Sequence, residues 1–313
     1  MRYFVTGGAG FIGSNYVEYL LENVQGLTGV TIFDKFTYAA NPDNYKKFLS
    51  DARLTVIKGD ICDFDFVKES MKNHDFVINM AAESHVDRSI KDSTDFITTN
   101  VLGARNVFES ARLVNIQNLV HVSTDEVYGS LSSSFATEDF PLEPNSPYAA
   151  SKASSDLIAR SYFKTYGLDI RITRCTNNYG PNQFPEKLVP LMLSRIKQGQ
   201  SLPLYGSGKN IREWIHVKDH CRAIHLVQTK GKAGEIYNIG SGLELSNLEL
   251  VKMLIDLCEV KNLQINFVED RLGHDFRYSL NSEKIRKMGF EPRINLRKGL
   301  QNLIESQDIV YFK

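Results

Sequence analysis

The first 174 residues alternate short runs rich in β-branched and aromatic residues with longer amphipathic stretches, and this alternation restricts the fold more than any other feature of the chain. It predicts strands over residues 3–6, 30–33, 54–58, 76–80, 119–123 and 170–173, and helices over residues 13–23, 64–71, 94–114 and 148–166. Such repetition is typical of a parallel sheet with helices on both faces. We therefore expect an α/β fold with a doubly wound parallel sheet.

The pattern changes after Arg174, where the turn-rich segment "NNYGPNQFPEK" begins. Beyond it we expect a helix over 188–198, a return strand over 235–239, a helix from about residue 245, a strand over 264–268 and a polar C-terminal tail. We predict a nucleotide-binding domain over 1–174 with a return segment at about 213–240. A smaller, discontinuous substrate domain would comprise 175–212 and 241–313, with the site in the cleft between the two.

The charge balance narrows the range of partners. The 313 residues include 37 basic and 37 acidic ones, with no basic run of five, which argues against nucleic acid or an anionic membrane surface. No segment resembles a signal peptide or is long enough to span a bilayer. The four scattered cysteines suit the reducing cytoplasm, either as buried apolar residues or as reactive thiols. No residue cluster has the spacing of a metal site.

The stretch "TGGAGFIG" places Gly7, Gly10 and Gly13 between the first predicted strand and the first helix. Glycines there let the backbone approach a pyrophosphate at a helix N-terminus. Asp34 ends the second strand, where a carboxylate binds a ribose hydroxyl and repels a 2′-phosphate, so NAD is favoured over NADP. Lys35 would either weaken the exclusion of NADP or be a solvated charge. A glycine-rich turn without a ligand is the alternative.

The turn "GDIC" follows the third predicted strand and carries Asp60. Its carboxylate could accept a hydrogen bond from an adenine amine. An ordinary loop aspartate explains it equally well, because Asp is a common turn residue.

The stretch "HVSTDEVYG" places Asp125 and Glu126 directly after a buried apolar run. Two acids at that point are costly unless they are partnered. In a dry cleft, adjacent carboxyl groups push their pKa values apart, so that one serves as a base and the other as an acid. Alternatively, Asp125 caps the next turn and Glu126 faces solvent.

Tyr148 and Lys152 lie four residues apart in "YAASK", which places both on one face of a helix. An ammonium nearby, with a nicotinamide cation beside it, favours the phenolate and lowers the pKa of the tyrosine from its usual value of about 10. Such a phenol takes a hydroxyl proton while hydride leaves the same carbon. By itself the pair would be no more than two neighbours on a helix surface.

Taken together, these motifs resemble those of the extended short-chain dehydrogenases/reductases, and within them the nucleotide-sugar 4,6-dehydratases, above all those of dTDP-glucose. The resemblance covers nearly the whole chain, in TGGAGFIGS, DKFTYAAN, GDICD, AAESHVDRSI, STDEVYG, SPYAASKASSD, NNYGPNQFPEKL, IREWIHVKDHCRA, YNIGSG and DRLGHDFRY. Related sugar 4-epimerases usually lack the Asp-Glu pair, and nucleotide-sugar decarboxylases typically carry Ser-Glu there. The chain departs from the family pattern at Ala40, Asn182 and Leu272.

The resemblance implies a reaction that explains the paired acids. Oxidation of C4 by NAD⁺ makes C5 an α-carbon, with Tyr148 taking the O4 proton and Thr124 hydrogen-bonding the C4 oxygen. Glu126 removes the C5 proton, and protonated Asp125 gives its proton to the departing O6. Hydride then returns to C6, which leaves a 4-keto-6-deoxy sugar.

The resemblance also assigns the remaining site residues. To NAD it assigns Gly7, Gly10, Phe11, Ile12, Gly13, Asp34, Lys35, Thr37, Asp60, Ile61, Ala81, Ala82, Thr99, Tyr148, Lys152 and Asn178. To the nucleoside-diphosphate sugar it assigns Ser84, Thr124, Asn177, Lys187, Leu188, Pro203, Tyr205, Arg212, Asn247, Arg271, His274 and Tyr278. Arg212 and Arg271 would contact the diphosphate, unless they form surface ion pairs. It further implies a cytoplasmic homodimer that pairs the helices at 94–114 and 148–166. A UDP-sugar 4,6-dehydratase, a 4-epimerase or a non-catalytic NAD sensor are the alternatives.

Overall fold

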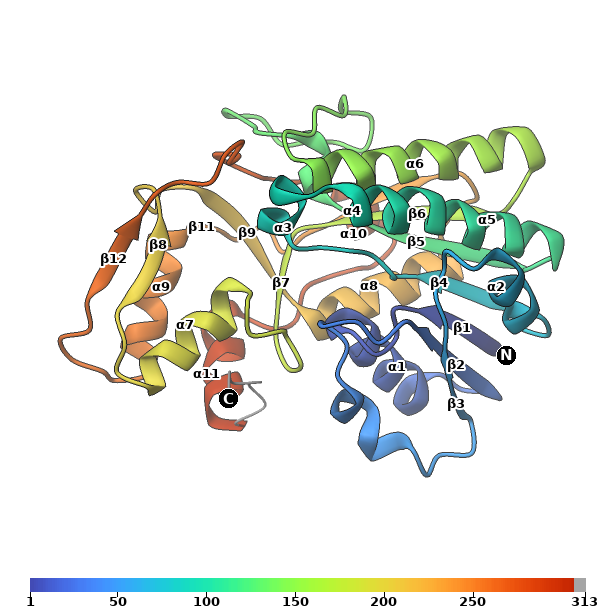
Figure 1. Ribbon diagram of the computed structural model, residues 1–313, viewed down its shortest axis with the longest axis horizontal. Helices are drawn as coiled ribbons and strands as arrows, with labels where there is room; N and C mark the ends of the chain where they lie inside the picture. The colour runs from blue at the N-terminus through green and yellow to red at the C-terminus, as the bar shows by residue number, and fades with distance from the viewer. Residues whose placement is uncertain (307–313) are drawn as a thin grey trace.

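Seven parallel strands form the central sheet of the computed structural model, which describes residues 1–306 (Figure 1). Their order is β10-β6-β5-β4-β1-β2-β3. The strands are β1 (Arg2–Thr6), β2 (Gly29–Asp34), β3 (Leu54–Lys58), β4 (Phe76–Asn79), β5 (Asn118–Thr124), β6 (Ile170–Cys175) and β10 (Ile236–Ile239). The predicted doubly wound parallel sheet is confirmed. The direction of winding reverses between β1 and β4, and in such sheets ligands bind at the carboxyl ends of the strands beside that point.

Helices cover both faces of the central sheet. The helices α1 (Phe11–Asn23) and α8 (Val217–Lys230) pack on one face, and α2 (Phe64–Met71), α5 (Ala104–Leu113) and α6 (Pro147–Tyr166) on the other. Successive side chains of a strand point to opposite faces. Accordingly, Tyr3 and Val5 join the α1–α8 core, whereas Phe4 between them joins the α2–α5–α6 core. All three are buried, which is why the strand reads as a continuous apolar run.

A second region holds two smaller sheets beside the central one (Figure 1). The first has the order β11-β9-β7 and the second pairs β12 with β8. Their strands are β7 (Asn177–Tyr179), β8 (Leu202–Tyr205), β9 (Ile211–His216), β11 (Glu244–Ser246) and β12 (Ile265–Val268), and the helices are α7 (Leu188–Lys197), α9 (Asn247–Leu257) and α11 (Leu296–Ser306). Leu193, Trp214, Leu254 and Leu300 belong to the separate apolar core of this region.

The helix predicted over 94–114 is interrupted. The structure has α4 (Thr94–Ile97), a π-helical segment (Thr98–Gly103) and then α5. Within that segment the Asn100 amide donates to the Glu83 carbonyl and to the Ser151 hydroxyl, both at 2.9 Å, and its oxygen accepts from the Glu83 N–H at 2.8 Å. These tertiary bonds hold Asn100 towards the chain that follows β4, and π turns of this kind often accompany functional sites.

The prediction of a polar C-terminal tail after residue 268 was wrong over the described residues. The chain forms α10 (Glu283–Lys287) and α11, whose Leu296, Leu300 and Leu303 are buried against α9 and β9. The last seven residues of the predicted tail, 307–313, lie outside the described residues. No prediction covered α3 (Val86–Lys91), α8 or the short strands β7, β8, β9 and β11. Across residues 1–306, no helix is both long and apolar enough to cross a membrane.

Candidate active site

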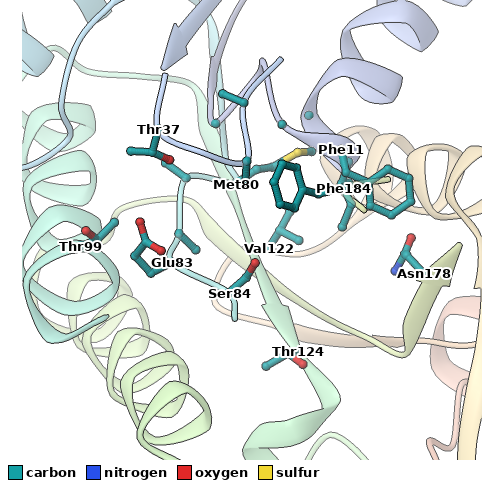
Figure 2. Close-up of a pocket in the computed structure, with 18 of the residues that line it drawn as sticks. Phe11, Thr37, Met80, Glu83, Ser84, Thr99, Val122, Thr124, Asn178 and Phe184 are labelled. Atoms are coloured by element: carbon teal, nitrogen blue, oxygen red, sulfur yellow. The ribbon is translucent and has the colours of Figure 1, made fainter. Parts of the chain in front are cut away.

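Two pockets adjoin at the carboxyl ends of the central strands. Every residue predicted to bind NAD lines the first pocket, as do Thr124, Asp125 and Glu126. Figure 2 shows Phe11, Thr37, Thr99, Thr124 and Asn178 around it. Every residue predicted to bind the sugar nucleotide, apart from Thr124, lines the second pocket. The residues that line both are Ser84, Glu126, Asn177, Glu186 and Lys187.

The glycine turn between β1 and α1 can adopt its shape only without side chains. Gly7 has a φ of 68°, and a Cβ atom there would lie 2.7 Å from the Ala81 nitrogen. A Cβ on Gly13 would overlap the Gly7 carbonyl oxygen. Gly10 is the N-cap of α1 and supplies no side chain to the free N–H groups of the first turn. Because those N–H groups attract anions, this end of the first pocket suits a pyrophosphate.

Asp34 lies at the end of β2 on the wall of the first pocket. Its two oxygens accept hydrogen bonds from the N–H groups of Ala9 at 3.0 Å and Phe36 at 2.8 Å. Burial raises the pKa of this carboxyl, and the two hydrogen bonds oppose the rise. The Lys35 ammonium lies 2.8 Å from Asp60, and the lysine side chain is 59% exposed, so it is an ion-paired charge that remains in contact with solvent.

Tyr148 and Lys152 both lie in the first pocket, on the first turns of α6. The Ser146 side chain caps the helix by accepting from the Ala149 N–H at 3.1 Å. Tyr148 is 9% exposed and Lys152 4% exposed, so they are not a surface pair. The Lys152 ammonium donates to the carbonyl of Val122 at 2.9 Å.

The lowered pKa predicted for Tyr148 depends on a nicotinamide cation beside the phenol, and the protein's own groups act in the opposite direction. Burial, followed by the nearby Glu126 carboxylate, raises the pKa of Tyr148 well above its usual value. Burial also lowers the pKa of Lys152 to about 8, against the opposing effect of Asp156. The reason is that the loss of hydration disfavours both charged forms, the phenolate and the ammonium.

Asp125 and Glu126 form the start of a short 3-10 turn after β5. Thr124, not Asp125, caps this turn, because its hydroxyl accepts from the Glu126 N–H at 3.3 Å. The same hydroxyl donates to Asp125 Oδ1 at 3.2 Å. Glu126 lines both pockets, so the alternative in which it faces solvent does not hold.

The two acids differ in their electrostatic surroundings. Burial and then the charges of Glu126 and Glu213 raise the pKa of Asp125 well above its usual value. Burial also raises the pKa of Glu126, but Arg212, Arg271 and Lys187 oppose that rise. The arrangement therefore favours a protonated Asp125 beside a more readily ionised Glu126, which is the division of roles that an elimination needs.

Cationic side chains surround the second pocket. The Arg212 guanidinium donates to the carbonyls of Ile211 at 2.8 Å and Asp275 at 2.9 Å, and lies 4.3 Å from the centre of the Tyr278 ring. Lys187 donates to the Ser84 carbonyl at 2.9 Å. Arg271 does form an ion pair, but within the pocket wall. These side chains provide positive charge in a concave, partly buried place, which suits a diphosphate.

Several lining residues were not predicted. They include Met80, Glu83, Val122, Cys175 and Phe184 in the first pocket, and His85, Asp87, Lys91 and Trp214 in the second. The motif "AAESHVDRSI" was a signal for residues 83–88, because it begins just after a predicted strand, where a parallel sheet presents its ligand. No group of three potential metal ligands occurs within residues 1–306.

Comparisons with known proteins identify the family of the chain. The family model described as GDP-mannose 4,6 dehydratase matches residues 4–303. A dTDP-glucose 4,6-dehydratase of an Actinoplanes species is 46% identical over 309 residues, which cover 97% of each chain. The crystal structure of DesIV, a dTDP-glucose 4,6-dehydratase of Streptomyces venezuelae with NAD and dTDP bound, superposes with a TM-score of 0.95. It is 50% identical and the match covers 97% of this chain and 96% of that one.

A solved epimerase shares the architecture at lower identity. The UDP-glucose 4-epimerase of Thermotoga maritima gives a TM-score of 0.90 at 27% identity, over 97% of this chain and 98% of that one. The fold alone therefore does not separate dehydratase from epimerase. The match to dehydratases at 46–50% identity over nearly the whole chain does separate the two activities. The chain belongs to the dTDP-glucose 4,6-dehydratase family of extended short-chain dehydrogenases/reductases.

Proposed function

We propose that this protein dehydrates dTDP-glucose to its 4-keto-6-deoxy derivative with NAD as a bound cofactor that is regenerated in each cycle. The observation that carries the proposal is the position of Glu126. It lies where the two pockets meet, next to a buried Asp125 and in the same pocket as Tyr148. An epimerase or a protein that only senses NAD has no use for an acid and a base at that junction.

The first pocket fits NAD through three features of the chain. The uncapped N-terminus of α1 would hold the pyrophosphate, Asp34 the adenosine ribose, and Lys152 the nicotinamide ribose. The other residues assigned to NAD line the same pocket. When bound, NAD would supply a hydride acceptor for C4 and later a hydride donor for C6.

The side chains of the chain itself would move the protons. Tyr148 takes the proton of the 4-hydroxyl, with Thr124 hydrogen-bonded to the same oxygen. Once C4 is a ketone, Glu126 removes the C5 proton. Asp125, kept protonated by burial, gives its proton to the 6-hydroxyl, which leaves as water.

The second pocket would bind the nucleoside diphosphate. Arg212 and Arg271 contact the diphosphate, with Lys187 and Asn177 nearby and Ser84 close to the sugar. The nucleotide end would lie among the remaining residues assigned to the substrate, which are Leu188, Pro203, Tyr205, Asn247, His274 and Tyr278.

We also propose the two-domain division at 1–174 with about 213–240, and 175–212 with 241–313. Separate apolar cores support it in the main, although Ile285 and Phe290 of the second segment pack in a core of the first domain and Trp214 of the return segment packs in the core of the second. We further propose a cytoplasmic homodimer formed through the helices at 94–114 and 148–166. Ile97, Leu102 and Leu157 of these segments are 49%, 52% and 58% exposed, and helix faces of this kind suit a self-complementary interface. The four free cysteines fit a reducing compartment.

The test is to incubate the purified protein with dTDP-glucose and, separately, with UDP-glucose, and then add alkali. A 4-keto-6-deoxy product absorbs near-ultraviolet light under alkali, whereas an epimerase product or an unchanged sugar does not. We expect absorbance with dTDP-glucose and little with UDP-glucose. Absorbance with UDP-glucose alone would instead identify a UDP-sugar dehydratase, and none with either sugar would reject dehydration of both.

A further inference from the structure

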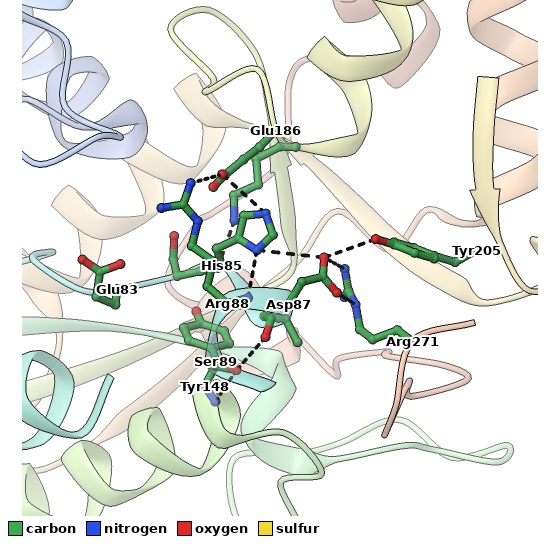
Figure 3. A network of polar contacts seen from close by, with 12 residues as sticks. Glu83, His85, Asp87, Arg88, Ser89, Tyr148, Glu186, Tyr205 and Arg271 are labelled. Atoms are coloured by element: carbon green, nitrogen blue, oxygen red, sulfur yellow. Dashed lines mark hydrogen bonds and ion pairs between the residues drawn. The ribbon is translucent and has the colours of Figure 1, made fainter. Parts of the chain in front are cut away.

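Asp87 and Arg271 form a two-pronged ion pair in the wall of the second pocket (Figure 3). Arg271 Nε lies 2.6 Å from Asp87 Oδ1 and Arg271 Nη2 lies 2.9 Å from Oδ2. The two residues are 184 positions apart, so the pair ties the segment after β12 to α3. Parallel charge-assisted bonds of this geometry fix the plane of a guanidinium as well as its position.

The helix α3 that carries Asp87 is itself fastened to the start of α6. The Ser89 hydroxyl donates to the Val86 carbonyl at 2.7 Å, so it is free to accept the hydrogen bond from the Tyr148 N–H at 3.2 Å. Arg88 pairs with Glu186 at 3.2 Å on the other side of the helix. The Asp87 carboxylate therefore has a defined place relative to Tyr148 (Figure 3).

Arg271, by contrast, comes from a segment with much exposed surface. Its neighbours Asp270 and Leu272 have exposed side chains, with Leu272 76% exposed. Within residues 1–306, Asp87 accepts every hydrogen bond that the Arg271 side chain makes, and the Tyr205 ring lies 5.2 Å from the guanidinium. Tyr205 also donates to Asp87 Oδ2 at 3.4 Å. Arg271 Nη1 has no hydrogen-bonding partner in that part of the chain and stays available.

We propose that Asp87 is a positioning residue that orients Arg271 for the diphosphate of the substrate. This inference rests on the proposed function, in which Arg271 contacts that diphosphate. Asp87 engages the Nε–Nη2 edge of the guanidinium and leaves Nη1 for a phosphate oxygen, at a place fixed relative to Tyr148 through α3. The pairing with Arg271 and the hydrogen bond from Tyr205 offset the charge of the carboxylate and so weaken its repulsion of the diphosphate, while a preorganised cation loses less freedom when the substrate binds.

The test compares Asp87→Asn with Asp51→Asn. Asp51 forms a similar two-pronged pair with Arg53, at 3.0 and 2.7 Å, and lines neither pocket. Titration calorimetry with dTDP measures binding, and the alkali assay with dTDP-glucose measures kcat and KM. We expect Asp87→Asn to raise both the Kd for dTDP and the KM about tenfold, since a charge-assisted contact is weakened, and to change kcat by about twofold or less. Asp51→Asn should change none of these, and both variants should keep their bound NAD.

A double-mutant cycle separates positioning from a general effect on the fold. Once Arg271→Ala has removed the cation, adding Asp87→Asn should weaken dTDP binding no further. If Asp87→Asn binds dTDP as tightly as the wild type or more tightly, or if its effect adds in full to that of Arg271→Ala, the positioning role is wrong. The proposed function fails differently, because the wild type itself would then not convert dTDP-glucose.

Discussion

The Oδ1 atom of Asp125 accepts a hydrogen bond from the Thr124 hydroxyl at 3.2 Å, and the Oδ2 atom of the same carboxyl is buried without a hydrogen-bonding partner among residues 1–306. An unpaired buried oxygen is costly, and more so when it is charged. A proton on Oδ2 relieves that cost and provides a donor at the junction of the two pockets. The resting geometry thus agrees with a general acid.

Replacing both acids should separate oxidation from elimination. In Asp125→Asn/Glu126→Gln, Tyr148 and the NAD pocket remain, so C4 is still oxidised, while the C5 proton stays in place. We expect NADH absorbance to appear on mixing with dTDP-glucose and to persist, whereas the wild type shows no net NADH. Asp125→Asn alone should still exchange C5 hydrogen with deuterated solvent but release water slowly. Dehydration by the double variant at the wild-type rate would reduce both acids to ordinary loop residues.

Tyr148→Phe should abolish the oxidation step while the cofactor stays bound. The ring packs as before, and only the phenol oxygen that takes the 4-hydroxyl proton is lost. A general base is worth about 10²–10⁴-fold in rate, so the turnover should fall by that factor. Turnover is measured by the alkali assay and retained NAD by release from denatured protein. Near wild-type turnover would contradict the role of Tyr148.

Asp34 should determine the preference for NAD over NADP. Its carboxylate lies in the first pocket at the end of β2, where it would face the adenosine ribose and repel a 2′-phosphate. We expect Asp34→Ala to narrow the difference in Kd between the two cofactors, measured by titration into stripped protein. Asp43→Asn, an exposed change outside both pockets, serves as the control. Equal affinities in the wild type would argue against this assignment.

Activity should fall as the pH rises through about 8. Burial lowers the pKa of Lys152 from its usual 10.5 to about 8, so its ammonium loses its proton above that value. Between about pH 8 and 10.5 the unfolded chain still binds the proton that the folded Lys152 has lost, so the contribution of Lys152 to the free energy of unfolding increases as the pH rises. The titration of Lys152 therefore does not unfold the protein, and the expected loss of activity has another cause, the loss of the ammonium from the site. A profile of kcat/KM against pH checks the fall. Lys152→Arg, which stays charged, should be less active but should not show the fall in kcat/KM above about pH 8. If the fall is unchanged in this variant, another group causes it.

The sequence alone determined the features that depend on residues close together in the chain. A strand such as β1 is recognisable because residues a few positions apart decide its alternation, and the turn at Gly7 because only glycine fits its backbone. The pairing of Tyr148 with Lys152 on one helix face follows from helix geometry in the same way. Boundaries shifted by one or two residues, since the ends of elements depend on capping contacts.

The tertiary structure decided what depends on distant groups. Asn100 lies in the π-helical segment that interrupts a predicted helix, and its side chain donates to the Glu83 carbonyl. Leu300 is buried in the apolar core of the second region, in a helix where the sequence predicted a polar tail. The ion pair of Asp87 with Arg271 joins positions 184 apart, and no local pattern indicates it. The rise that the protein's own groups cause in the pKa of Tyr148 likewise depends on the tertiary structure. The neighbouring charge was visible in the chain, but the loss of hydration exists only once the fold has closed around the phenol.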